Sequence, residues 1–143
     1  MTDKGKQLLR EHEGKRLDPY QDIFGNWTVG VGHLLTDNPP HKRITPERCE
    51  ELFFEDVSKA EAECWRVLPW FGELNPVRQD VFINLMFNMG ASRLLGFRKM
   101  IDHASRGDFV GAAFELNNSL WARQVQESRR RELCDAMESG KWS

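Results

Sequence analysis

The chain has 143 residues, of which 40% are hydrophobic and 29% are charged, a composition typical of one globular domain. A chain of this length removes roughly two-thirds of its unfolded surface from water, so its core needs no disulfide support. No segment approaches the roughly 20 apolar residues of a membrane span, and the formal net charge of -2 provides no overall attraction to nucleic acid. We therefore expect neither membrane insertion nor a nucleic-acid partner.

The three cysteines, Cys49, Cys64 and Cys134, occur without a CxxC motif or a Cys/His cluster. An odd number of isolated cysteines is typical of buried small side chains, and it predicts neither a disulfide framework nor a zinc site. We expect no metal ion and no other cofactor. The first residues lack the apolar core of a signal peptide, so we expect the protein to be held in the cytoplasm.

The first predicted element is a helix over residues 3–12, with Asp3 as its N-cap and Gly14 as its stop. Glu13 then lies at the end of this helix. Turn formers such as Asp22 follow, and residues 27–32 carry β-branched and aromatic side chains interrupted by glycine. This pattern predicts a small, twisted antiparallel sheet between residues 15 and 35.

Residues 36–40 contain two prolines and are expected to form a loop. After it, Thr45 and Pro46 predict an N-cap with proline in the first turn of a helix over about 46–68. Apolar residues recur three and four apart at positions 49, 52, 53, 57, 60 and 64. At about 1.5 Å per residue this helix is about 30 Å long, so we expect it to connect two lobes.

A strongly apolar helix is predicted over 77–89, ended by Gly90, and shorter helices are predicted over 98–105, 108–118 and 127–138. The predicted fold class is therefore α+β. A small antiparallel sheet lobe lies near the N-terminus, a larger helical lobe follows the long helix, and a cleft separates the two lobes.

Hydrolysis of a glycosidic bond needs two carboxyl groups, one protonated and one ionised. Glu13 lies at a helix end beside packed structure, where desolvation favours the protonated form. Asp22 lies in a turn, where solvent and hydrogen bonds favour the ionised form, and Thr28 can point its hydroxyl to the same face and hold a water molecule. With 22 acidic residues in the chain, this spacing alone favours two solvated surface carboxylates.

The surrounding residues favour the catalytic interpretation. The motif is similar to the signature of the phage-type lysozymes, glycoside hydrolase family 24, at Glu13-Gly14, Tyr20, Asp22 and 28–33. The resemblance resumes at 45–57, 84–90 and 96–97, and at Trp121 with the arginines after it. It therefore extends over nearly the whole chain.

The resemblance implies one lysozyme domain, with a sheet lobe at about 13–45, a connecting helix at about 46–68 and a helical lobe at about 69–143 that includes helix 3–12. It further implies that Glu13 is the general acid and that Asp22 activates a water molecule with help from Thr28. The family reaction inverts the anomeric carbon, for which the two carboxyl groups stand roughly 6.5–9.5 Å apart.

Supporting roles also follow from the resemblance. It implies that His33 pairs with Asp56, a structural role that competes with a role as general base. One arginine, Arg129 or Arg131, is implied to hold Glu13 in place. The arginine cluster at 129–131 also fits a solvated helix face or a patch for anionic wall polymers.

Four residues are predicted to contact substrate. Gly30 and Gly32 lie where a side chain would obstruct a sugar chain, and Leu34 and Phe87 match apolar positions that line the family's cleft. Core packing explains Phe87 nearly as well. The chain departs from the family where the loop between Leu35 and Thr45 is much shorter, which puts subsites formed by that loop in doubt.

The resemblance implies a monomeric endolysin that hydrolyses the β-1,4 bond between N-acetylmuramic acid and N-acetylglucosamine in bacterial peptidoglycan and so lyses the host cell. A separate holin-type protein would release it from the host cytoplasm. Two alternatives stay open: a lytic transglycosylase, and a wall-binding phage component without catalysis. A helical nucleic-acid binder is a remote fourth hypothesis, because the basic cluster is short and the net charge is negative.

Overall fold

The computed structural model describes residues 1–35 and 42–143 and begins with helix α1, Asp3–Glu13. Its N-cap is Thr2, whose hydroxyl accepts a hydrogen bond from the backbone N–H of Gly5, so the expectation for Asp3 was wrong by one residue. Asp3 instead occupies the first turn, where a carboxylate interacts favourably with the helix dipole. The helix ends at Gly14, which adopts a φ of 72°.

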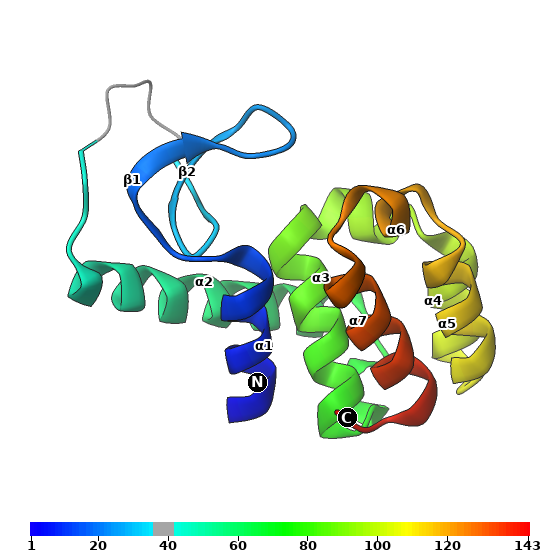
Figure 1. Ribbon diagram of the computed structural model, residues 1–143. Coiled ribbons are helices and arrows are strands. Elements are labelled where there is room, and N and C mark those ends of the chain that lie inside the picture. Colours follow the sequence, from blue (N-terminus) through cyan, green and yellow to red (C-terminus); the bar gives the residue numbers. More distant parts are fainter. Residues whose placement is uncertain (36–41) are drawn as a thin grey trace.

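The predicted sheet follows as three antiparallel strands in the order β1-β2-β3: Arg16–Gln21, Trp27–Gly30 and His33–Leu34. In its register Tyr20 lies opposite Thr28, and Val29 lies opposite His33. Figure 1 shows this sheet beside the end of α1, with the hairpin between β1 and β2 extending toward α3. The loop expected at 36–40 lies outside the described residues.

Helix α2, Pro46–Val67, is the long connecting helix, and its N-cap is Thr45 as predicted. All six of its predicted apolar positions are buried, and five of them belong to two separate cores. Cys49, Phe53 and Val57 pack with Leu9 and Val31 in the smaller core, beneath the sheet. Ala60 and Cys64, which lie nearer the C-terminal end of α2, belong to the larger helical core. The helix therefore joins the two lobes by contributing to both.

The helical lobe contains a 3-10 turn and five further helices: η1 Phe71–Glu73, α3 Pro76–Leu95, α4 Arg98–Ser105, α5 Phe109–Asn117, α6 Leu120–Gln124 and α7 Glu127–Ser139. Gly90, with φ 78° and ψ 167°, interrupts α3 where the sequence predicted its end, and a further helical turn follows the kink. Helix α6 was not predicted, because five residues are too few to show an apolar period. The side chain of Ser119 caps it.

This arrangement confirms the predicted α+β class. Figure 1 shows α2 running beneath the sheet and reaching α3, with the helical lobe on the far side.

The three cysteines are buried and unbonded, and burial raises the pKa of Cys64 to about 12. None of the helices that the structure describes is long and apolar enough to span a lipid bilayer.

Candidate active site

Glu13, Asp22 and Thr28 line one cavity of about 330 Å³ between the two lobes. Its walls come from the end of α1, the β1–β2 hairpin, the middle of α3 and the segment from α6 to α7. Three of the residues that the sequence singled out for chemistry are therefore brought to one place. Gly32, Phe87 and Arg129 also contribute to its lining.

Glu13 is the last residue of α1, and its side chain is only 15% exposed. Its Oε1 accepts a hydrogen bond from Nη2 of Arg129 at 2.9 Å. Its Oε2 lies beside Gly32: a Cβ added at Gly32 would stand 2.9 Å from this oxygen. Gly32 also has a φ of 66°, so both backbone conformation and space at this position favour glycine. A side chain at position 32 would therefore collide first with Glu13, whereas the sequence analysis expected it to obstruct the sugar chain.

Arg129, and not Arg131, is the arginine that holds Glu13. The Arg129 side chain is buried on α7, whereas Arg131 two residues later is exposed to solvent. Asn84 on α3 accepts hydrogen bonds from Nε and Nη2 of Arg129 through its Oδ1, at 3.2 and 2.8 Å. A buried guanidinium is costly unless its donors are paired, and Glu13 and Asn84 supply that pairing.

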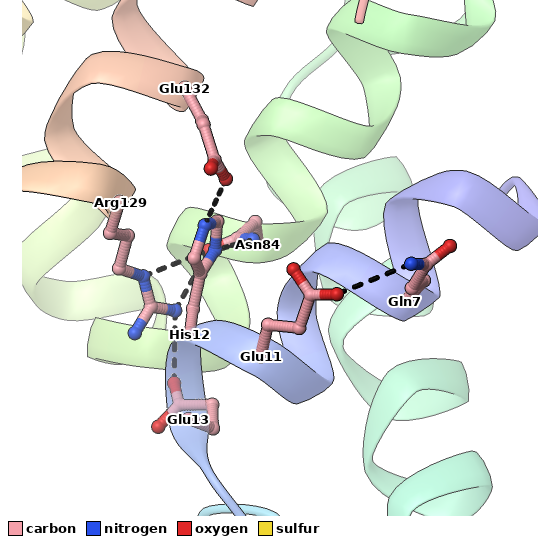
Figure 2. A network of polar contacts seen from close by, with 7 residues as sticks. All are labelled: Gln7, Glu11, His12, Glu13, Asn84, Arg129 and Glu132. Carbon is pink, nitrogen blue, oxygen red and sulfur yellow. Dashed lines mark hydrogen bonds and ion pairs between the residues drawn. The ribbon is translucent and has the colours of Figure 1, made fainter.

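The polar network continues beyond Asn84, as Figure 2 shows. The amide nitrogen of Asn84 lies 3.2 Å from Nδ1 of His12, and Nε2 of His12 lies 2.7 Å from Oε2 of Glu132. Burial lowers the pKa of His12, while Glu132 opposes this effect. Sequence analysis missed His12, Asn84 and Glu132. The available signal was Asn84 itself, a polar residue among the apolar residues 81–86 of α3.

Asp22 is held by its own turn. Its Oδ1 accepts hydrogen bonds from the backbone N–H groups of Phe24 and Asn26 at 2.9 and 2.8 Å, and its backbone N–H donates to the carbonyl of Asn26 at 2.8 Å. Gly25 provides the positive φ, 80°, that this tight connection needs. Aspartate is favoured in such turns because its side chain caps backbone donors two residues further on.

Thr28 lies on β2 and is only 3% exposed. Its hydroxyl donates a hydrogen bond to the carbonyl of Asn26 at 3.0 Å, so its oxygen can accept one from a water molecule in the cavity. Tyr20 lies opposite Thr28 on β1, and the guanidinium of Arg16 lies 4.5 Å from the centre of the Tyr20 ring. Burial, followed by the negative charge of Glu13, raises the pKa of Tyr20, which therefore stays a neutral phenol.

Two further cavities continue the central one on either side. A cavity of about 590 Å³ shares Gly32 and Phe87 with it and extends to Leu34 and Gly90. A cavity of about 540 Å³ shares Phe24 with it and extends to Trp121. Together they form a groove along the boundary between the lobes, with the two carboxyl groups at its middle.

The remaining predicted residues divide between this groove and the core. Leu34, 52% exposed, lines one end of the groove as expected. Phe87 lines two of the cavities and also packs against Phe53, with ring centres 6.0 Å apart. Gly30 lies outside the lining of these three cavities, and a Cβ added to it would meet Sγ of Cys49 at 3.2 Å. Its place is in the packing against α2.

His33 and Asp56 are paired as the resemblance implied. Nδ1 of His33 lies 2.7 Å from Oδ2 of Asp56, which joins β3 to the middle of α2. Both side chains border the end of the groove next to Leu34. His33 thus lies away from the central cavity that contains Glu13 and Asp22, and a structural role suits this position better than general-base chemistry.

Comparison with known proteins gives one consistent result. Residues 10–135 match the model of the family described as phage lysozyme. The chain is 28% identical to a "Probable T4-type lysozyme 2" of Dictyostelium discoideum, over 98% of this chain and 96% of that protein. It is also 28% identical to an "Endolysin" of Acyrthosiphon pisum secondary endosymbiont phage 1, over 93% of this chain and 87% of the relative.

A third relative, a "SAR-endolysin" of Enterobacteria phage P21, is 28% identical over 85% of this chain and 76% of its own length. The family match includes Glu13, Asp22, Thr28 and Arg129 and extends over both lobes. The fold and the paired carboxyl groups in an interlobe groove agree with this match. The chain therefore belongs to the phage lysozyme family, and it is a glycoside hydrolase of the muramidase class.

Proposed function

We propose that this lysozyme is an endolysin that hydrolyses the β-1,4 bond between N-acetylmuramic acid and N-acetylglucosamine in bacterial peptidoglycan, with inversion at the anomeric carbon. One observation carries the proposal: Glu13 and Asp22 line the same cavity, at the middle of a groove that continues on both sides. A polysaccharide that is cut within its length needs a groove of this kind.

Glu13 acts as the general acid in this proposal. Arginine has only hydrogen-bond donors, so the oxygen that faces Arg129, Oε1, must be an acceptor. The proton of a neutral Glu13 therefore resides on Oε2, the oxygen beside Gly32 in the lining of the groove. From there it is transferred to the glycosidic oxygen as the bond to the leaving sugar breaks.

Asp22 acts as the base that activates water. Two backbone N–H groups already donate to its Oδ1, so we assign the contact with water to Oδ2. The hydroxyl oxygen of Thr28 accepts the second hydrogen of that water, which orients it toward the anomeric carbon. Attack from the face opposite the leaving group inverts the configuration.

The substrate-binding roles of Gly32, Leu34 and Phe87 belong to the same proposal. All three line the groove between the central cavity and its end near Asp56. Leu34 and Phe87 present apolar surface, which suits the apolar faces of pyranose rings. The whole assembly of sheet lobe, connecting helix and helical lobe, at about 13–45, 46–68 and 69–143, works as one domain in this proposal.

Digestion of purified sacculi tests the reaction. Wild-type protein should release muropeptides with new reducing ends that incorporate ¹⁸O from labelled water, and the first product seen by NMR should be the α-anomer. Glu13→Gln should lower the rate by about 10²–10⁴-fold. Anhydro ends without ¹⁸O would identify a lytic transglycosylase, and binding to sacculi without new ends would identify a wall-binding component. Either result overturns the proposal.

We further propose that the monomeric enzyme accumulates in the host cytoplasm and reaches the wall through a separate holin-type protein. The SAR-endolysin relative makes release without such a partner the competing route. Expression in a Gram-negative host with and without a co-expressed holin distinguishes them. Lysis that depends on the holin supports the proposal, whereas equally rapid lysis without it contradicts it. Size-exclusion chromatography with light scattering should give the 16.7 kDa mass of a monomer.

A further inference from the structure

A buried chain of hydrogen bonds leads from the proposed acid to a second carboxylate, Glu132 on α7. It starts at Glu13, passes through Arg129 and Asn84 to His12, and ends at Glu132. The contacts measure 2.9, 2.8, 3.2 and 2.7 Å in that order. Asn84, Arg129 and His12 are 1%, 4% and 8% exposed, so water does not substitute easily for any of these partners. Figure 2 shows the five side chains converging from three helices.

Donor and acceptor counts determine the protonation state of His12. Because Arg129 offers only donors, the amide of Asn84 must turn its Oδ1 toward Arg129 and its Nδ2 toward His12. An amide nitrogen donates, so Nδ1 of His12 must be an acceptor without a proton. The ring is then neutral with its proton on Nε2, which donates to Glu132.

Protonation of His12 is incompatible with this order. A second proton on Nδ1 would face the N–H of Asn84, placing two donors against each other at a buried contact. Rotation of the Asn84 amide would relieve that contact, but it would turn Nδ2 toward the guanidinium of Arg129. One of the two contacts is lost in either case, and Arg129 loses the support that directs its Nη2 to Glu13.

The charges around His12 act in both directions. Glu132 and Arg129 face it from α7, Glu13 is its neighbour on α1, and α3 contributes the neutral Asn84. Burial lowers the pKa of His12 from its ordinary value of 6.5, the hydrogen bond and charge of Glu132 raise it, and Arg129 lowers it. The neutral form is therefore the one present at pH 7, in agreement with the hydrogen-bond order.

We propose that His12 is a positioning residue: when neutral it holds Asn84 and Arg129 so that Arg129 orients Glu13, and when protonated at acidic pH it releases them. The proposal rests on the proposed role of Glu13 as the acid. It predicts that the acidic limb of the pH–activity profile includes the titration of His12, which acts on Glu13 through Asn84 and Arg129.

Replacement of Glu132, the residue at which the hydrogen-bond network ends, tests this proposal most directly. Glu132→Gln keeps an acceptor for Nε2–H but removes the negative charge that favours the imidazolium. We expect the acidic limb of kcat to move to lower pH by about one unit, with KM nearly unchanged. Glu138→Gln, the same replacement at an exposed position of α7, should leave the profile where it is in the wild type. An identical acidic limb in Glu132→Gln and wild type would overturn the proposal.

Imidazole ¹⁵N shifts provide a test that needs no turnover. At pH 7 His12 should show the neutral Nε2–H tautomer, and it should titrate below 6.5; an Nδ1–H tautomer or an imidazolium at pH 7 would overturn the proposal. His12→Leu should lower kcat with little change in KM, while an unchanged kcat would also contradict it. Failure of the proposed function is separate, because it appears as full activity in Glu13→Gln.

Discussion

Glu13 and Asp22 line the same cavity, yet the protein holds them by opposite means. Asp22 is positioned by residues within four positions of itself, through two backbone N–H groups of its own turn. Glu13 is positioned by Arg129, 116 residues away, which is in turn held by Asn84 on a third helix. One carboxyl group thus depends on local structure, and the other depends on the packing of α1, α3 and α7.

This difference separates the electrostatic surroundings of the two groups. The Glu13 side chain is 15% exposed and lies against a buried guanidinium, whereas the turn that holds Asp22 is open to solvent on the hairpin. The two carboxyl groups therefore differ in the partners that hold them and in the span of sequence from which those partners come. We therefore expect replacement of Asp22 to lower catalytic activity alone, and replacement of the residues that hold Glu13 to lower the stability of the fold as well.

The largest expected effect is a loss of activity when Asp22, the carboxyl group held by its own turn, is replaced. Asp22→Asn keeps an oxygen that accepts hydrogen bonds from Phe24 and Asn26 but removes the charge that activates water in the proposed mechanism. We expect turnover of sacculi to fall by about 10²–10⁴-fold, and the free energy of unfolding to stay within about 0.5 kcal/mol of wild type. Turbidity assays and urea denaturation measure the two quantities. A large loss of stability would show that the turn depends on the charge of Asp22, which would break the comparison.

The next largest effect is the loss of stability when Arg129, the tertiary partner of Glu13, is replaced. Arg129→Met removes the buried partner of Glu13 and Asn84, so both are left with unpaired buried polar atoms. We expect the free energy of unfolding to fall by about 3–5 kcal/mol, together with a loss of activity. The control is Arg131→Met on the exposed side of α7, which should change stability by less than about 0.5 kcal/mol. Similar effects of the two replacements would contradict the assignment of Arg129.

Gly32 and Gly107 form a matched pair for the space around Glu13. Both have positive φ, 66° and 76°, but only at Gly32 would an added Cβ meet an atom of Glu13. Replacement by alanine should lower stability by about 1–2 kcal/mol at both positions because of the left-handed backbone. Only Gly32→Ala should also lose activity, by at least about tenfold, because it displaces the proposed acid. Equal activity in the two variants would show that Oε2 tolerates displacement.

The smallest expected effect is a pH dependence of stability. Burial lowers the pKa of His12 in the folded state, so the unfolded chain binds the proton first as pH falls. Stability from this source is complete above 6.5 and decreases from there to the lower folded pKa, with a slope of at most about 1.4 kcal/mol per pH unit. His12→Gln should flatten this part of the curve in denaturation experiments between pH 7.5 and 5. A curve parallel to wild type would mean that other groups produce the slope.

Several features of the fold could be predicted because they depend on local patterns. The buried positions of α2 follow from a helical period, its start follows from Thr45 and Pro46, and the hairpin follows from turn residues near Asp22. The same reasoning did not predict α6, which is too short to show a helical period, or the contact of Gly30 with Cys49 on another element.

The candidate site divides in the same way. The sequence by itself determined that Asp22 would be held in a turn and that Glu13 would end a helix, because both follow from residues close to them along the chain. Only the tertiary structure decided between Arg129 and Arg131 and brought His12, Asn84 and Glu132 into one network. Helix register and packing select which side chains of three distant helices meet, and no local pattern contains that information.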